Sequence, residues 1–250
     1  MSISVAAAPA PRRFGLTTFR VPAFVVLALG LLVVFLNVTP GDLTDPFVLT
    51  PSFITSRLLR HIELVAIAFA GSTVIGLALG IGLADRGRAG RVIAFLPANL
   101  GQAIPSVGAL AIATTISGLG VTATVEALTV YGLLPIVRNS VAALQGVDES
   151  MVDAARGMGM TPLQSLLRVR LPLASAGIFA GLRTSLVLIV GTATLGNFVG
   201  GGGLGDVIAA GYGNQSEHVI ITGAVLVAAL AILSDWGLGL VETAVIPTTT

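Results

Sequence analysis

The sequence predicts an all-α integral membrane protein with about six transmembrane helices. Three observations lead to this fold class: 54% of the residues are hydrophobic, 10% are charged, and long uncharged apolar runs alternate with short arginine-containing segments. A soluble domain carries about a quarter charged residues, because water must solvate its surface. A chain with so few charges is suited to lipid, where a helix needs about 20 apolar residues to cross the hydrocarbon core.

The apolar runs divide the chain into its expected spans. Residues 92–125 carry no charge and are too many for one crossing, so we divide this run at Ser117-Gly118-Leu119-Gly120. The fourth span that results contains Glu126 and has Pro135 near its end. The six expected spans cover residues 22–38, 64–84, 92–116, 122–137, 174–199 and 218–240.

Arginine placement predicts the orientation. Basic residues concentrate in cytoplasmic loops, and the segments 1–20, 85–91 and 138–172 hold three, three and four of the 13 basic residues. We therefore expect a cytoplasmic N-terminal tail over 1–20, a single transmembrane domain over 21–242 with an inner loop at 138–172, and a C-terminal tail over 243–250. No small-x-small cleavage site follows the first apolar run, so we expect that run to be retained.

Composition excludes several kinds of chemistry. All 13 basic residues are Arg, and without Lys the chain cannot form a standard phosphate-binding P-loop, so any ATP-dependent work requires a partner. There is no Cys, and His61 and His218 are too few for a metal centre or a catalytic triad. A net charge of +1 does not indicate nucleic-acid binding. We expect no cofactor, no metal site and no catalytic activity.

Glycines within the spans predict close helix packing. Gly76-x-x-x-Gly80 and Gly177-x-x-x-Gly181 place two small residues on one helix face, which lets a neighbouring backbone approach. The alternative for each motif is the ordinary glycine-rich composition of membrane helices. His61 and Glu63 open the second span, and we expect both at the outer headgroup level.

Charged residues near the last two spans are candidates for a polar path. Arg183 lies in the fifth span, Asp206 follows that span, and Asp235 lies late in the sixth. A charge inside a membrane costs several kcal/mol, so such a group usually faces water or a partner, or extends to the membrane surface. We expect Arg183 and Asp206 to line a path, and the alternative for Arg183 is that it extends to the inner surface.

A glycine cluster follows the fifth span at the expected outer face. It formally matches the dinucleotide-binding fingerprint, but that motif requires a preceding strand. We expect a hinge or gate along the path, and the alternative is a flexible turn. The residues are Gly200, Gly201, Gly202, Gly203 and Gly205.

The inner loop predicts two short helices. Asp148 is suited to cap the first, and Gly157 and Gly159 are suited to end it. Ala154 and Ala155 give this helix a small-residue face that another protein could approach closely, although the pattern is equally typical of a purely structural loop.

The second helix of the loop has a clear beginning. Thr161 and Gln164 have the spacing of a capping box, with Pro162 at the first helical position. We expect Pro172 to break this helix before the fifth span begins.

This loop resembles the "EAA" motif of permease subunits of bacterial ATP-binding-cassette (ABC) importers. That motif reads Glu-Ala-Ala, three residues, Gly, nine residues, Ile-x-Leu-Pro. The matching positions are Asp153-Ala154-Ala155, Gly159, Val169 and Leu171-Pro172, with Asp for Glu and Val for Ile. The resemblance implies that the first loop helix is a coupling helix that fits a cleft on a separate cytoplasmic ATPase.

A narrower resemblance concerns the solute. Segments 101–106, 131–139 and 191–206 are similar to permeases for osmoprotectants such as glycine betaine, carnitine, choline or proline. Methionine-type permeases share parts of this pattern, so another amino acid is the alternative solute. Some relatives carry a fused binding domain after the last span. None follows here, so we expect a separate extracytoplasmic binding protein.

The resemblance implies a multi-pass protein of the bacterial cell membrane that is surrounded by lipid. Two permease subunits, alike or different, would enclose a path that opens alternately to either side as two ATPase subunits close and reset. The competing hypothesis is an ion-coupled secondary transporter. That class usually has paired internal repeats and buried ionisable groups, and the sequence contains no repeat. A membrane enzyme is disfavoured, because no catalytic residues cluster.

Overall fold

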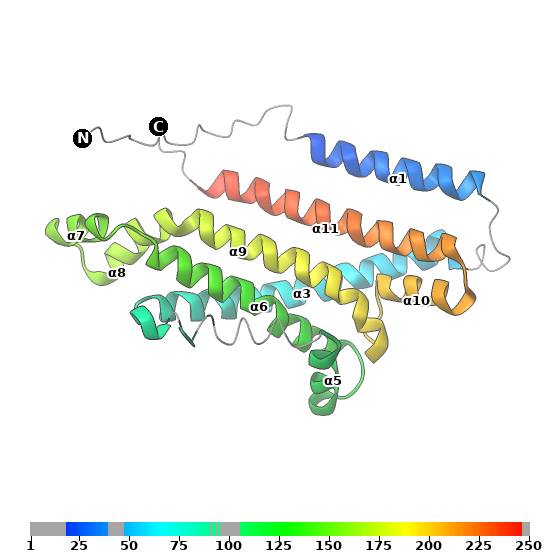
Figure 1. Ribbon diagram of the computed structural model, residues 1–250, viewed down its shortest axis with the longest axis horizontal. Coiled ribbons are helices and arrows are strands. Elements are labelled where there is room, and N and C mark those ends of the chain that lie inside the picture. The colour runs from blue at the N-terminus through cyan, green and yellow to red at the C-terminus, as the bar shows by residue number, and fades with distance from the viewer. Residues whose placement is uncertain (1–18, 40–47, 91, 94, 96–105, 247–250) are drawn as a thin grey trace.

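The computed structural model describes residues 19–39, 48–90, 92–93, 95 and 106–246, and this part of the chain is helical and contains no strand. The all-α prediction is confirmed. Long helices run side by side to form a bundle, as Figure 1 shows. The elements are α1 (Arg20–Val38), α3 (Pro51–Ala84), α5 (Ser106–Ser117), α6 (Val121–Gln145), α7 (Glu149–Gly157), α8 (Pro162–Ser165), the π-helical turn η2 (Leu166–Arg170), α9 (Leu171–Thr192), the 3₁₀ turn η3 (Ala193–Val199), α10 (Leu204–Asn214) and α11 (Glu217–Val245).

Within the described part of the chain, five helical stretches are long and apolar enough to cross a membrane, and α5, with 12 residues, is a shorter apolar helix. The expected third span, 92–116, lies partly outside the described residues, so the count of about six stays a prediction. The fourth span is longer than expected: α6 runs over 25 residues with Pro135 in its interior.

The second span begins 13 residues before the apolar run, because α3 starts at Pro51 rather than at residue 64. The hydroxyl of Thr50 accepts a hydrogen bond from the Phe53 N–H at 3.3 Å, and Pro51 occupies the first helical turn, where its missing N–H costs nothing. The 34 residues of α3 extend about 50 Å, well beyond a hydrocarbon core of about 30 Å. Local capping chemistry, not hydrophobicity, sets this boundary.

Helices α3, α6 and α9 form the centre of the bundle, and they approach closely at glycines, as expected. A Cβ at Gly80 of α3 would lie 2.6 Å from the Cβ of Ser140 on α6. A Cβ at Gly177 of α9 would lie 2.6 Å from the Cβ of Ala143 on the same helix, α6. Small residues therefore let both neighbours lie directly against α6.

Helix α1 packs along α11 at the edge of the bundle (Figure 1). Near its end, Thr39 Oγ1 lies 2.7 Å from His218 Nε2, and the Phe35 ring meets the His218 ring edge-on with centroids 5.0 Å apart. Much of the apolar surface of α1 is exposed, which suits contact with lipid.

Candidate functional site

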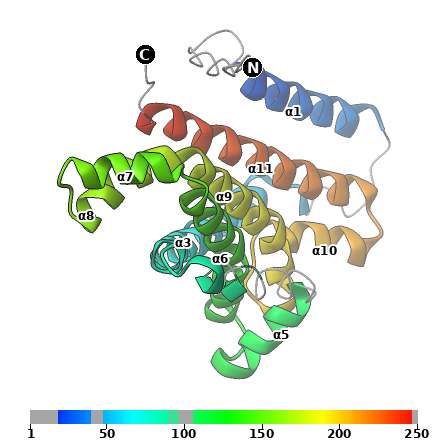
Figure 2. The same cartoon turned by 60° about the vertical axis from the view of Figure 1, so that its left-hand side comes forward.

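The inner loop projects beyond one end of the bundle. Figures 1 and 2 show α7 and α8 at that end and α10 at the other. The Asp148 carboxylate accepts a hydrogen bond from the Ser150 N–H at 2.9 Å, which confirms the expected cap of α7. This bond to the charged form holds the pKa of Asp148 below its usual value.

The residues of the EAA-like motif divide into a buried and an exposed set. Ala155 is completely buried, whereas Asp153, Ala154 and Gly159 are exposed. The chain therefore uses Ala155 to pack α7 against α8 and η2, and this internal role was not expected from the sequence. Gly159 has φ +80°, the left-handed conformation that favours glycine at a helix end.

Met151, Ala154 and Met158 make up an exposed face of the loop, which we call the coupling face. Their spacing of three and four residues places them on one side of the helix. Met151 is 48% exposed and Met158 is 70% exposed. Large apolar side chains that project from the end of a bundle, away from its sides, are typical of a surface that contacts another protein.

The second loop helix begins as expected but does not end as expected. The capping box is present, with Gln164 N–H on the Thr161 hydroxyl at 3.3 Å and the Gln164 side chain on the Thr161 N–H at 2.9 Å. The prediction that Pro172 breaks this helix is wrong, because α8, η2 and α9 continue into one another. In the π-helical turn the Leu171 N–H bonds to the Leu166 carbonyl, and this wider turn carries the chain into α9 past Pro172.

An ion pair and two hydrogen bonds connect the loop to the end of α3. Arg170 forms an ion pair with Asp85, and the Gln145 side chain donates hydrogen bonds to the carbonyls of Ala84 and Gly87 at 3.0 and 2.9 Å. A cavity of about 500 Å³ lies between these residues and α7. Leu171 and Pro172, at the end of the motif, are the first two residues of α9, and Pro172 is exposed.

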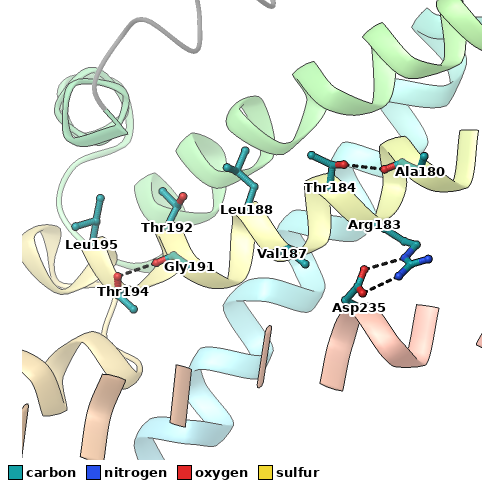
Figure 3. A pocket seen from close by; sticks show the side chains of 10 residues that line it. All are labelled: Ala180, Arg183, Thr184, Val187, Leu188, Gly191, Thr192, Thr194, Leu195 and Asp235. Carbon is teal, nitrogen blue, oxygen red and sulfur yellow. Dashed lines mark hydrogen bonds and ion pairs between the residues drawn. The ribbon is translucent and has the colours of Figure 1, made fainter. Parts of the chain in front are cut away.

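A second feature is an open groove of about 840 Å³ along α9, lined from Ala180 to Leu195 and by Asp235 of α11. Figure 3 shows Arg183 and Asp235 pointing toward one another. The guanidinium makes two bonds to the Asp235 carboxylate, from Nε at 2.8 Å and from Nη2 at 2.7 Å, and its Nη1 lies 3.3 Å from Glu242. Arg183 thus extends sideways to α11, about 18 Å along α9 from Leu171.

Asp206, the other residue expected to line a path, lies apart from this groove. Its carboxylate pairs with Arg57 of α3 at 2.7 Å, at the start of α10. The structure therefore does not bring Arg183 and Asp206 together. Glu242, which does join Arg183, was missed by sequence reasoning, although its spacing of seven residues from Asp235 places both on one face of α11.

The glycine cluster forms the connection from η3 to α10. Gly200, Gly202 and Gly203 have φ of +80°, +82° and +93°, which only glycine adopts readily, and Gly201 does not share this conformation. Gly205 lies in the first turn of α10, where an added Cβ would be 1.9 Å from the Thr194 carbonyl oxygen.

His61 joins this connection to the bundle and is completely buried, so its side chain faces the protein interior; its depth in the membrane stays a prediction. Its Nδ1 accepts a hydrogen bond from the Leu204 N–H at 3.3 Å, so Nε2 carries the proton and donates to the Val190 carbonyl at 3.0 Å. His61 lies within α3 on its packed side, while Glu63 is exposed and pairs with Arg60.

The membrane-length helices, the projecting loop and the groove define the transmembrane subunit of a transporter. Residues 72–247 match the family described as "Binding-protein-dependent transport system inner membrane component", and the chain belongs to this family. It is thus a multi-pass membrane permease of a bacterial ABC importer, as the loop motif predicted.

Individual relatives agree with this assignment. The chain is 37% identical to the carnitine transport permease protein OpuCD of Listeria monocytogenes over 82% of this chain and 92% of that protein. It is 38% identical to the choline transport system permease protein OpuBB of Bacillus subtilis over 76% of this chain and 88% of that protein. A solved structure of the MetNI methionine ABC transporter in an inward-facing conformation has a similar fold, with a TM-score of 0.67 and 25% identity over 78% of this chain and 96% of that one.

Proposed function

We propose that this permease carries small trimethylammonium osmoprotectants such as glycine betaine, carnitine or choline, and that a separate ATPase drives it. The printed functions of the relatives support the solute class: they are carnitine and choline permeases, and they match this chain over most of their length. The narrower sequence resemblance points the same way.

The observation that carries the proposal is the coupling face at the end of the bundle. Its methionines and Ala154 are exposed on α7 and its C-terminal cap, and this helix packs against α8 and η2 of the same loop. The same end of the bundle carries Arg86 and Arg88, which follow α3, and Arg168, which lies in η2. The positive-inside rule therefore predicts that this end lies in the cytoplasm, on the same side as the N-terminus. An ATPase would bind here, with Asp153 and Gly159 beside the contact.

The transport path, in this proposal, follows the groove on α9. The groove is open along its length, so a second permease subunit, identical or different, would complete the enclosure. The glycine connection at the opposite end would act as hinge or gate, because its left-handed residues can change direction with little steric cost. A separate extracytoplasmic binding protein would deliver solute to that end.

The experiment compares Gly159→Ala with Gly159→Asn in the complex with its ATPase and binding protein. An alanine at φ +80° costs about 1–2 kcal/mol, whereas asparagine tolerates this conformation better. If the turn positions the coupling face, G159A lowers ATPase binding about tenfold and G159N lowers it less. Co-purification in detergent and solute-stimulated ATP hydrolysis in vesicles measure both effects.

Two results would contradict the proposal. ATPase binding that G159A leaves intact removes the role of the loop. Binding that falls more in G159N than in G159A would instead mean that the side chain itself obstructs the ATPase, since an added Cβ at Gly159 meets nothing within 4 Å inside this chain, and the contact would then lie at Gly159 itself. Uptake that continues without any ATPase indicates an ion-coupled secondary transporter instead.

The alternative solute is methionine or another amino acid, which the fold likeness to the methionine transporter favours. The same vesicles distinguish the two. Stimulation of ATP hydrolysis by glycine betaine, carnitine or choline supports the proposal, and stimulation by methionine alone overturns the solute class while leaving the coupling role intact.

A further inference from the structure

Three charged side chains meet beside the groove, and we call them the charge cluster: Arg183 of α9 with Asp235 and Glu242 of α11. The two carboxylates are seven residues apart, which is two helical turns, so they lie on one face of α11. Arg183 reaches both from the neighbouring helix, at 2.7 and 3.3 Å.

The geometry commits the guanidinium to these two partners. Asp235 accepts from Nε and Nη2 and therefore occupies one whole edge of the planar fork, and Glu242 accepts from Nη1. A solute carboxylate would have to displace one of them. Arg183 is therefore poorly placed to act as an anion receptor, although an unpaired arginine in such a groove would be one.

The net charge of the cluster favours a cation in the groove, not an anion. One guanidinium and two carboxylates leave the cluster with a net charge of −1. Arg183 and Asp235 are the charged residues among those that line the groove, and the others are apolar or uncharged, such as Thr184 and Thr192. Glu242 is not among the residues that line the groove, but it lies 3.3 Å from Arg183, so its charge acts on the groove through the cluster and gives the potential there a negative sign.

We propose that the charge cluster makes the groove selective for cationic groups, trimethylammonium groups above all, and unfavourable to anions. This proposal rests on the proposed function, in which the groove is part of the path. It assigns a specificity-determining role to Glu242, the residue that supplies the excess charge. Arg183 and Asp235 neutralise one another and hold the cluster together.

The natural chain contains no cysteine, which permits a direct test. Thr184 lies in the groove next to Arg183, is exposed, and makes only a local hydrogen bond to the Ala180 carbonyl at 2.8 Å, so T184C introduces one thiol with little disturbance. In the assembled importer, this thiol is treated with a methanethiosulfonate that carries a trimethylammonium group and with one that carries a sulfonate. The ratio of the two rate constants reports the local potential.

Two further variants separate charge from structure. E242Q removes the excess charge and leaves both Arg183–Asp235 bonds in place, so the cation-to-anion ratio falls about tenfold. The double variant R183Q/D235N removes the ion pair but keeps the net charge of −1, so the ratio stays near that of T184C alone.

A ratio unchanged by E242Q overturns the proposal, as does a ratio in the double variant as low as that in E242Q. Failure of the thiol to react with either reagent overturns it as well, since the groove then holds no aqueous path. ATP hydrolysis in the same samples distinguishes the two proposals. Solute-stimulated hydrolysis that persists alongside an unchanged ratio removes the charge selectivity and leaves the ABC permease function standing.

Discussion

Ala154 and Ala155 are neighbours in α7, and the structure predicts opposite consequences for enlarging them. Ala155 is completely buried against the loop, and Ala154 is exposed on the coupling face. Ala155→Leu forces three extra carbon atoms into a packed site, which costs about 1–3 kcal/mol. Ala154→Leu costs the isolated chain almost nothing, because leucine is nearly as good a helix former as alanine.

The two substitutions therefore separate folding of the loop from binding of the ATPase. In A155L we expect hydrogen exchange of the amides in 149–157 to accelerate about tenfold or more in the permease alone. Overpacking destabilises the folded loop and so lowers the free energy of its local unfolding by the same amount. In A154L exchange stays at the wild-type rate, and ATPase binding falls about tenfold or more, since the same three carbons now obstruct the contact between proteins.

The assays are hydrogen–deuterium exchange of the detergent-solubilised permease and titration with the purified ATPase. Ala154→Ser, which keeps a small side chain, is the matched control and should bind normally. ATPase binding by A154L at the wild-type level would refute the coupling face, and unchanged exchange in A155L would refute the packing role of Ala155.

Two further predictions concern the glycine connection at the opposite end of the bundle and the cap of α7. Gly205→Ala places a Cβ 1.9 Å from the Thr194 carbonyl, so backbone must move and the purified protein should lose its sharp gel-filtration peak, whereas Gly213→Ala, which meets nothing within 4 Å, should be tolerated. A normal peak for G205A would contradict the packing described here. The lowered pKa of Asp148 means that its cap stabilises α7 above the pKa of the unfolded state, and that this stabilisation is lost as pH falls through the folded pKa. Exchange protection of α7 should hold near neutral pH and drop in acid, and Asp148→Asn, which caps without titrating, should reduce that drop.

Interactions between residues that are close in sequence made much of the inner loop predictable. The cap at Asp148, the capping box at Thr161 and the left-handed Gly159 all depend on residues within a few positions of one another. The same holds for the membrane helices, whose apolar runs are continuous in sequence. Two helix boundaries were wrong: at Pro51 a local cap overrode the hydrophobic pattern, and at Pro172 a π-helical turn let the helix continue past the proline.

Features made by distant segments were not predictable in this way. Arg183 and Asp235 are 52 positions apart, and His61 bonds to a residue 143 positions away. The packing of α9 on α11 brings two carboxylates to the Arg183 guanidinium, and the sequence alone did not indicate this pairing. Packing likewise buried Ala155 and exposed Ala154, a difference that no spacing rule contains.

The sequence by itself determined the membrane fold, the loop and the class of transporter, because hydrophobicity, capping and the loop motif depend on residues that are close together in the sequence. Only the tertiary structure decided which charges pair, which alanine faces outward and where the groove runs. The physical reason is that each of these depends on side chains from different helices meeting at one place, and the direction in which a helix presents a residue follows from the helices packed around it.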